Sequence, residues 1–416
     1  MLDIKFIRQN PKKVKEGCRK KQVKVDVDKL LELDKKRREM LQKIEGLRHE
    51  LNIISTSTKK PTDTEIKEAQ KIKTNLKKLE KGLEPLEKEL DTFLYQIPNL
   101  PLDDVPTGKD ESENVVLREW GEKTKFDFKP RGYLEIAENL DLIDVKRAAK
   151  VSGTRFGFLK NEAVLLEFSL INFAFETLIK EGFTPVIPPF LIKPEPFRGM
   201  GYLERGSEEV YHLEKDDLYL IGTAEQIIGP MHTNEIFEGK ELPKKYLGFS
   251  SCFRREAGSY GKETKGIFRV HQFDKVEMFS FCHPEKSREE HLFFLEIEEK
   301  LMQFLKIPYR VVQMCTGDLG DPAAAKYDIE AWLPSEKIFR ETHSTSNCTD
   351  FQARRLNIRY KDLKTKKLEF VHTLNGTAFA IGRILIAIIE NYQQEDGSII
   401  IPQVLQKYLP FKVIKK

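Results

Sequence analysis

The spacing of apolar side chains divides the chain into a helical N-terminal part and a mixed remainder. Between residues 30 and 97 the apolar positions recur at alternating steps of three and four, which is typical of a coiled-coil seam. The polar stretch STSTKKPTDTE, Ser55 to Glu65, separates two such registers and predicts a turn. Two long helices joined by a short turn pack antiparallel, so the pattern predicts a helical hairpin over about 27–97, within an N-terminal domain of residues 1–100.

Two residues in this region do not suit a regular coiled coil. The first register is Leu30, Leu33, Arg37, Met40, Ile44, Leu47, Leu51 and Ile54, and the second is Ala69, Ile72, Leu76, Leu79, Leu83, Leu86, Leu90, Phe93 and Ile97. Arg37 occupies a seam position, which lowers stability or sets the register. Pro85 removes a backbone hydrogen bond inside the second helix and predicts a kink. By itself, such a hairpin favours a spacer or an oligomerisation device.

The pattern changes after a linker that is rich in proline and acidic residues, predicted over 101–114. A long apolar helix is predicted over 164–183, followed by a strand over 184–192 that prolines interrupt. Strand-like runs then alternate with loops as far as Tyr360, and a last helix is predicted over 377–394. Runs of strands bounded by helices predict an α+β domain over 115–416, built on an antiparallel sheet flanked by helices.

Composition narrows the class of protein. Charged residues make up 33% of the chain, against about 25% in an average soluble protein, as expected for long solvated helices. The net charge is only +4, so any nucleic-acid surface must be local. The five cysteines show no C-x-x-C pair, which indicates neither a zinc site nor a disulfide framework. The N-terminus lacks the pattern of a targeting signal and no run reaches the roughly 20 apolar residues of a membrane span, so we expect a cytoplasmic protein without membrane association.

Residues 249–279, FSSCFRREAGSYGKETKGIFRVHQFDKVEMF, have the residue types of a ligand-binding hairpin. Arg254, Arg255 and Glu256 precede a loop that contains Gly258, Gly261 and Gly266. The next run spaces Arg269, Phe273 and Glu277 four apart, which predicts one shared strand face. Arginine can bind phosphates bidentately, an aromatic ring can stack on a base, and a glutamate can hold an ammonium or hydroxyl group. Taken alone, the pattern favours the simpler alternative of a surface hairpin with cross-strand ion pairs.

A second candidate lies near the C-terminus, where NGTAFAIGR (375–383) places Arg383 in an apolar segment that is predicted to be helical. A lone arginine there binds an anion or extends to water at the helix edge, and the pattern leaves both readings open. The chain has no G-x-x-x-x-G-K-[ST] motif, no G-x-G-x-x-G after a strand and no H-E-x-x-H helix. A nucleotide site would therefore have to consist of arginines and a stacking ring.

Together, these segments resemble the three signature motifs of class II aminoacyl-tRNA synthetases, here about 164–191, 249–279 and 374–394. Combined with the N-terminal hairpin, the segments TAEQ (223–226), FRREAGS, RVHQFDKVE and SNCTDFQARR (346–355) resemble the seryl-tRNA synthetase family over nearly the whole chain. The resemblance implies a homodimer formed through the first motif. It also implies ATP and L-serine as substrates, Mg²⁺ as cofactor, serine tRNA as acceptor and selenocysteine tRNA as a second candidate acceptor.

The resemblance also assigns roles to individual residues. It implies that serine is bound by Thr223, Ala224, Glu225, Glu277 and Thr377. It implies that ATP is contacted by Arg254, Arg255, Glu256, Val270, His271, Gln272, Phe273, Glu341, Thr342, His343, Ser344 and Arg383. Arg254, Arg269 and Arg383 are the implied catalytic residues, since the serine carboxylate is already ionised and its attack on the α-phosphate needs positioning and charge neutralisation. Glu341 and Ser344 are the implied Mg²⁺ ligands.

The resemblance gives the hairpin a function and leaves two rival readings. It implies that the hairpin binds tRNA through phosphate contacts from Lys35, Lys36, Arg38, Lys43 and Arg48. The chain departs from the family pattern in ETHSTSN (341–347), where His343 replaces a serine and Thr345 a cysteine. The rivals are a related ligase that acts on another acceptor and an inactive RNA-binding protein. The intact hairpin argues against the first, and the retained Arg254, Glu256, Glu277 and Arg383 argue against the second.

Overall fold

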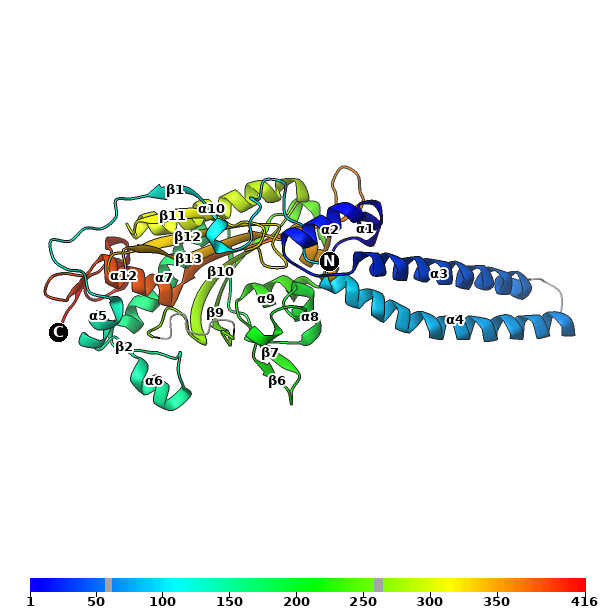
Figure 1. The fold of residues 1–416 in the computed structure, drawn as a ribbon, viewed down its shortest axis with the longest axis horizontal. Coiled ribbons are helices and arrows are strands. Elements are labelled where there is room, and N and C mark those ends of the chain that lie inside the picture. Colours follow the sequence, from blue (N-terminus) through cyan, green and yellow to red (C-terminus); the bar gives the residue numbers. More distant parts are fainter. Residues whose placement is uncertain (57–61, 258–264) are drawn as a thin grey trace. The chain divides into compact units, whose positions relative to one another are not determined.

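The computed structural model describes residues 1–56, 62–257 and 265–416, which form two compact units, Met1–Pro98 and Asn99–Lys416. The first unit consists of α1 (Ile4–Gln9), α2 (Pro11–Lys20), α3 (Val27–Thr56) and α4 (Asp63–Gln96). α3 and α4 lie side by side and antiparallel, so the predicted helical hairpin is confirmed (Figure 1). Of the predicted turn, residues 57–61 lie outside the described part of the chain. Thr62 caps the N-terminus of α4 in a capping box, in which the Glu65 side chain accepts a hydrogen bond from the Thr62 backbone amide.

The predicted registers form the contact between α3 and α4. Ile44, Ile72 and Leu76 are buried in one cluster, and Met40, Leu47, Leu51, Ile54, Leu79 and Leu83 pack against it. Arg37 is accommodated at the seam because its Nε donates to Oε1 of Glu87 on the other helix, at 2.8 Å. α4 continues through Pro85 as a single helix.

The second unit is built on one large sheet, which has eight strands among the residues that the structure describes. In spatial order the strands are β1 (Val115–Trp120), β11 (Tyr309–Gln313), β12 (Ala325–Leu333), β13 (Ile338–Asn347), β16 (His372–Ala380), β10 (Gln272–Cys282), β9 (Lys244–Phe253) and β4 (Thr184–Val186). Neighbours are antiparallel except β4 and β9, which are parallel. The predicted antiparallel sheet is therefore confirmed, with one parallel strand at its edge.

Three helices cover one face of this sheet: α7 (Glu162–Lys180), α10 (Ser287–Phe304) and α12 (Ile381–Asn391) (Figure 1). Their apolar side chains and those of β10, β11, β12 and β16 form the main core. Because successive strand residues alternate in direction, Val276 and Met278 enter this core while Glu277 points to the other face. The face opposite the three helices is thus available for a binding site.

The remaining elements are short. The helices are α5 (Tyr133–Asn139), α6 (Val145–Ser152), α8 (Pro194–Met200), α9 (Glu225–Ile228) and α11 (Phe351–Leu356). The short strands are β2 (Ile143–Asp144), β3 (Phe158–Leu159), β5 (Leu191–Ile192), β6 (His212–Leu213), β7 (Leu218–Leu220), β8 (Ile236–Glu238), β14 (Arg359–Lys361), β15 (Leu368–Phe370), β17 (Ile399–Ile400) and β18 (Val413–Ile414).

Two β-bulges interrupt the central ladders. On β13 the pairing with β12 shifts between His343 and Glu341, so Thr342 is the extra residue. On β16 the pairing with β10 shifts between Phe379 and Thr377, so Ala378 is the extra residue. A bulge reverses the side-chain alternation beyond it and is frequent beside active sites. Both bulges lie among the residues that were expected to bind ATP and serine.

Two predictions of local structure were wrong, and both concern the expected site. The segment 377–380 belongs to strand β16, and the helix begins only at Ile381. A short apolar run fits a buried strand as well as a buried helix, so periodicity could not distinguish them. Arg269 lies before β10, which begins at Gln272, so it does not share a strand with Phe273 and Glu277.

The segment 101–114, expected as a linker, packs on the second unit. The Leu102 amide donates to the Ala324 carbonyl at 2.9 Å, and Val105 is buried in a small cluster with Val312 and Met314. No helix within the described ranges combines the length and apolar character that a membrane crossing requires.

Candidate active site

Two buried carboxyl groups mark the part of the sheet where serine was expected to bind. Glu277 of β10 is 1% exposed, and its carboxylate lies 2.5 Å from the Lys275 Nζ on the same face. Glu225 begins α9, is 3% exposed and accepts a hydrogen bond from the Tyr202 hydroxyl. Burial, and then the negative charge of Glu277, raise the pKa of Glu225 to about 7. A pocket with two such acids suits a small cationic group.

The other expected serine contacts lie beside these acids. Thr377 pairs directly with Glu277 across the β10–β16 ladder, so the two side chains share a face. Thr223 is buried, and its hydroxyl accepts from the Glu225 amide at 3.5 Å. The Ala224 side chain lies inside a hydrophobic cluster, so only its backbone is suited to a polar ligand.

Arg254 is held at the end of β9 next to the expected adenine platform. Its Nε donates to the Gly222 carbonyl at 3.2 Å, and its guanidinium carbon lies 5.3 Å from the centre of the Phe273 ring. The His271 Nδ1 lies 3.0 Å from the Arg254 carbonyl, which ties the two sides of the hairpin together. Val270 is buried, whereas Arg255 and Gln272 are exposed. The guanidinium and ring thus form a half-buried pair that can contact a phosphate and a base.

Glu256 and Arg269 form an ion pair across the same hairpin. Glu256 has a φ of +51°, a left-handed conformation that a non-glycine residue adopts at some cost. The Glu256 carbonyl also accepts from Arg155 at 3.1 Å. Gly258 and Gly261, predicted in this loop, lie outside the described residues. The structure therefore brings the predicted arginines and the glutamate of the hairpin together at one end of the sheet.

Arg383 lies at the start of α12 and pairs with Glu341 of β13. Its Nη1 is 3.0 Å from the Glu341 Oε1 and donates to the Glu341 carbonyl at 3.1 Å. Its guanidinium carbon lies 4.8 Å from the centre of the Phe268 ring. Burial alone raises the pKa of Glu341, but the positive charges of Arg383 and Lys326 outweigh it and lower the pKa to about 2. Glu341 is therefore ionised at neutral pH, as a cation ligand must be.

The bulge at Thr342 decides whether Glu341 and Ser344 can act together. The two residues are three apart, and a regular strand would direct them to opposite faces. With Thr342 as the extra residue, Glu341 and Ser344 share a face. Ser344 pairs directly with Asp328 across the β12–β13 ladder, and the Asp328 carboxylate lies 3.5 Å from the Lys326 Nζ. A carboxylate and a hydroxyl are hard oxygen donors of the kind Mg²⁺ prefers.

His343 and Thr345 point into the helix-covered side of the sheet. The His343 ring is 1% exposed, its Nδ1 lies 2.9 Å from the Thr342 hydroxyl, and its ring centre is 5.9 Å from that of Phe379. Burial lowers its pKa to about 3, so the ring is neutral. Thr345 is also buried and donates to the Asn375 carbonyl at 2.9 Å. Both departures from the family pattern therefore lie beneath the site, whereas Glu341 and Ser344 face it.

Several residues at the site were missed by the sequence reasoning: Tyr202, Lys275, Phe268, Lys326 and Asp328. Lys275 and Asp328 could have been found, since each is a charged residue in an apolar strand and lies on the same face as an expected ligand. Tyr202 and Phe268 carried no local signal, because their partners Glu225 and Arg383 are distant in sequence. Among the described residues, no three His, Cys, Asp or Glu side chains form a metal-binding group.

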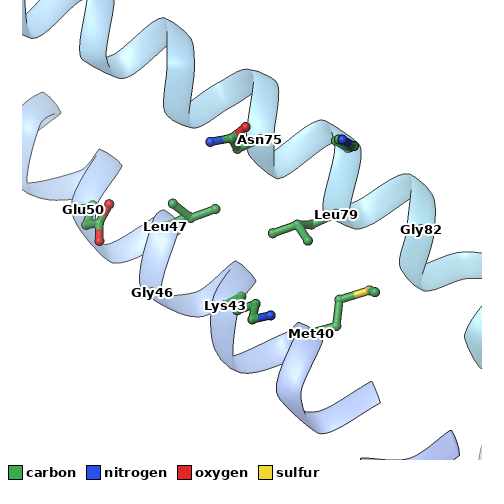
Figure 2. Close-up of a pocket in the computed structure, with 9 residues that line it drawn as sticks. Met40, Lys43, Gly46, Leu47, Glu50, Asn75, Leu79 and Gly82 are labelled. Carbon is green, nitrogen blue, oxygen red and sulfur yellow. The ribbon is translucent and has the colours of Figure 1, made fainter. Parts of the chain in front are cut away.

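The helical hairpin has its own candidate surface. Lys35, Lys36, Arg38, Lys43 and Arg48 are all exposed on α3. Some already have acidic partners, such as Glu32 for Lys36 and Glu80 for Arg48. A cavity of about 670 Å³ opens between α3 and α4, and Gly46 and Gly82 are among the residues that line it (Figure 2). No expected serine or ATP ligand lines it.

Comparison with known proteins identifies both units. Residues 1–101 match the seryl-tRNA synthetase N-terminal domain, and residues 209–392 match the tRNA synthetase class II core domain (G, H, P, S and T). The chain is 49% identical to the serine--tRNA ligase of Dictyoglomus turgidum over 423 residues, covering 100% of this chain and 99% of the relative. It is 47% identical to that of Pyrococcus horikoshii, covering 100% and 97%.

Solved structures agree. The seryl-tRNA synthetase from Pyrococcus horikoshii complexed with ATP superposes with a TM-score of 0.92 at 46% identity, covering 100% of this chain and 99% of that one. The cytoplasmic serine-tRNA ligase from Naegleria fowleri in complex with AMP gives 0.89 at 37% identity, with the same coverage. The resemblance drawn from the sequence motifs is confirmed, and the chain belongs to the seryl-tRNA synthetase family of class II aminoacyl-tRNA synthetases.

Proposed function

We propose that the protein is a serine--tRNA ligase, which activates L-serine with ATP and transfers the seryl group to the terminal ribose of serine tRNA. The single observation that carries this proposal is the match over the full length of serine--tRNA ligases, hairpin included. The arrangement of charged groups on the face of the sheet opposite the three helices also supports the proposal. The acids Glu225 and Glu277 lie together, and Arg254 and Arg383 each lie beside an aromatic ring.

In the proposed site the serine ammonium group lies against Glu225 and Glu277. The Glu277 carboxylate and the Thr377 hydroxyl face the same space and can hydrogen-bond the serine hydroxyl. A buried site built for a hydroxyl group rejects alanine and glycine, because its own polar groups would then lose their partners. Threonine is excluded by shape.

For ATP, we propose that adenine stacks on Phe273 and that Arg254, Arg269 and Arg383 neutralise the phosphates. The Arg254 guanidinium is already oriented by the Gly222 carbonyl and Phe273, which limits its reorganisation when charge develops on phosphorus. Glu341 and Ser344 would hold Mg²⁺, which supplies further charge neutralisation at the phosphates.

We propose that the hairpin holds the tRNA and that two chains form the working enzyme. The exposed cations of α3 can contact phosphates, which position an RNA without reading its sequence. Two large apolar side chains within the first motif, Phe168 at 56% and Ile187 at 74% exposure, suit burial in a homodimer interface. Selenocysteine tRNA is a second candidate acceptor. We also extend to this chain the cytoplasmic location that the name of the Naegleria relative gives.

The proposal is tested by exchange of labelled pyrophosphate into ATP. Exchange with serine, and not with threonine, alanine or glycine, is the expected result. Charging of serine tRNA should follow when tRNA is added. Exchange without charging would favour a ligase for another acceptor. Absence of exchange with any amino acid, together with tRNA binding, would favour an inactive RNA-binding protein.

A further inference from the structure

The bulge on β16 has two buried polar side chains beneath it that have no part in the proposed reaction. They are Glu298 of α10, which is 0% exposed, and His343 of β13. The Thr377 backbone amide faces the Glu298 carboxyl group, and the backbone of the extra residue Ala378 faces the His343 ring. A bulge takes backbone polar groups out of the ladder, so each of these side chains lies opposite a group that needs a partner.

Glu298 is the more unusual of the two. Neither of its carboxyl oxygens has a hydrogen-bond partner at normal geometry among the described residues. Burial, and then the negative charges of Asp328 and Glu277, raise its pKa well above the usual range. Burial disfavours the charged form of such an acid, and leaving its carboxyl group without a partner is costly. The Thr377 amide is the donor that faces it.

The backbone at Thr377 also determines the shape of the proposed serine pocket. Thr377 and Glu277 are directly paired and face the substrate side, whereas Phe379, on the other side of the bulge, faces the core. A small rotation of this bulge would therefore move the Thr377 hydroxyl relative to Glu277. The ATP contacts at Arg254 and Phe273 lie on other parts of the sheet, at the β9–β10 hairpin.

We propose that Glu298 is a positioning residue for amino-acid recognition. When serine binds, the Glu298 carboxyl group accepts a hydrogen bond from the facing Thr377 amide and fixes the bulge, which in turn orients the Thr377 hydroxyl toward the serine side chain. This inference rests on the proposed function. Glu298 touches neither substrate in this proposal, yet it influences the binding of serine and not the binding of ATP.

The test compares substitutions of nearly equal size. Glu298→Gln keeps an acceptor oxygen for the Thr377 amide, whereas Glu298→Met fills the space without one. We expect Glu298→Met to raise the KM for serine roughly ten-fold, the effect of removing one buried hydrogen bond, with the KM for ATP within about two-fold of wild type. Glu298→Gln should restore a serine KM close to that of the wild type. Ile297→Val on the same helix is the matched core control and should leave both values unchanged.

The measurement is serine-dependent pyrophosphate exchange at varied serine and varied ATP. A wild-type protein without exchange contradicts the proposed function itself. A wild-type protein that exchanges, with Glu298→Met equal to wild type or changing both KM values alike, overturns only the role of Glu298. Glu298→Gln as impaired as Glu298→Met also overturns it. If Glu298→Met does not fold, Glu298→Asp takes its place, because its shorter side chain should still raise the serine KM selectively.

Discussion

Among individual residues, the arginines carry most of the proposed chemistry, and the fold holds them in place before ATP arrives. Arg254 is the clearest case, with a backbone carbonyl on its Nε and an aromatic ring against its guanidinium group. Such preorganisation makes a charge effective in the transition state. Arg383 is held in the same way by Glu341 and Phe268.

Replacing Arg254 with alanine should therefore reduce serine-dependent pyrophosphate exchange about 10²–10³-fold, as removal of a preorganised donor does in other enzymes. Binding of serine tRNA, measured by filter retention, should stay within about two-fold of wild type, because phosphate contacts from the hairpin are unaffected. Arg118→Ala, which removes a surface partner of Glu299, is the control. Unchanged exchange in Arg254→Ala would contradict the site assignment.

The buried Glu225 predicts a pH dependence at the proposed serine site. Its pKa is raised to about 7, mainly by burial and secondly by Glu277. Only the ionised carboxylate attracts the serine ammonium group, so kcat/KM for serine should rise about ten-fold per pH unit below about 7 and level off above it. The pH profile of pyrophosphate exchange measures this. Glu225→Gln should lower the plateau and remove the slope, and a profile that falls between pH 6 and 8 would contradict the assignment.

Among the helices and strands, the hairpin of α3 and α4 is held together by a narrow apolar seam, and two exposed glycines lie beside it. Gly46 and Gly82 lie inside α3 and α4 and border the cavity between them (Figure 2). Neither has a positive φ. A Cβ on Gly46 would meet nothing within 4 Å, and one on Gly82 would only reach Met40 at 3.9 Å.

Alanine at Gly46 should therefore stabilise the protein by about 0.5–1 kcal/mol, because alanine restricts the unfolded chain and fits the helix. Denaturant unfolding followed by circular dichroism measures the change. Gly182→Ala is the opposite control, since Gly182 has a φ of +86° that a Cβ disfavours. Gly182→Ala should destabilise the protein. If both substitutions changed the free energy of unfolding in the same direction, the prediction for Gly46 would be wrong.

For the protein as one enzyme, two functions are assigned to separate compact units, with the chemistry in the second and the tRNA contacts in the first. The double substitution Lys35→Ala and Lys43→Ala on α3 should weaken the dependence of tRNA binding on salt. The slope of the logarithm of the binding constant against the logarithm of the salt concentration should become less steep by about 0.7–0.9 for each phosphate that the hairpin no longer neutralises. Exchange without tRNA should be unchanged. Lys77→Ala with Lys81→Ala on α4 is the matched pair, and equal losses of affinity in both pairs would contradict the assignment to α3.

The proposed dimer leads to a second prediction for the assembled enzyme. Phe168→Glu places a charge on the exposed apolar surface of α7, and burying it in an interface would be costly. Sedimentation velocity should show a dimer for the wild type and a monomer for Phe168→Glu. Val151→Glu is the control, because Val151 is an exposed residue of α6 in the same unit, and this variant should remain a dimer. A monomeric wild type would contradict the proposed interface.

Long periodic patterns and extended motifs were enough to predict the helical hairpin, the α+β class and the family. The registers on α3 and α4 needed only the spacing of apolar residues, and the packing in the hairpin follows them. The types of charged residue at the site could also be predicted, because an arginine or an acid in apolar surroundings is costly unless it is paired or binds a ligand.

How those residues meet could be seen only once the strands were paired. Glu341 and Ser344 share a face because Thr342 bulges, and Thr377 lies on a strand because the helix begins four residues later. A bulge depends on pairing between strands that are distant in the chain, which local periodicity does not contain. For the same reason Glu298, on a helix 79 residues before Thr377, gave no sign in the sequence of its place beneath the proposed serine pocket.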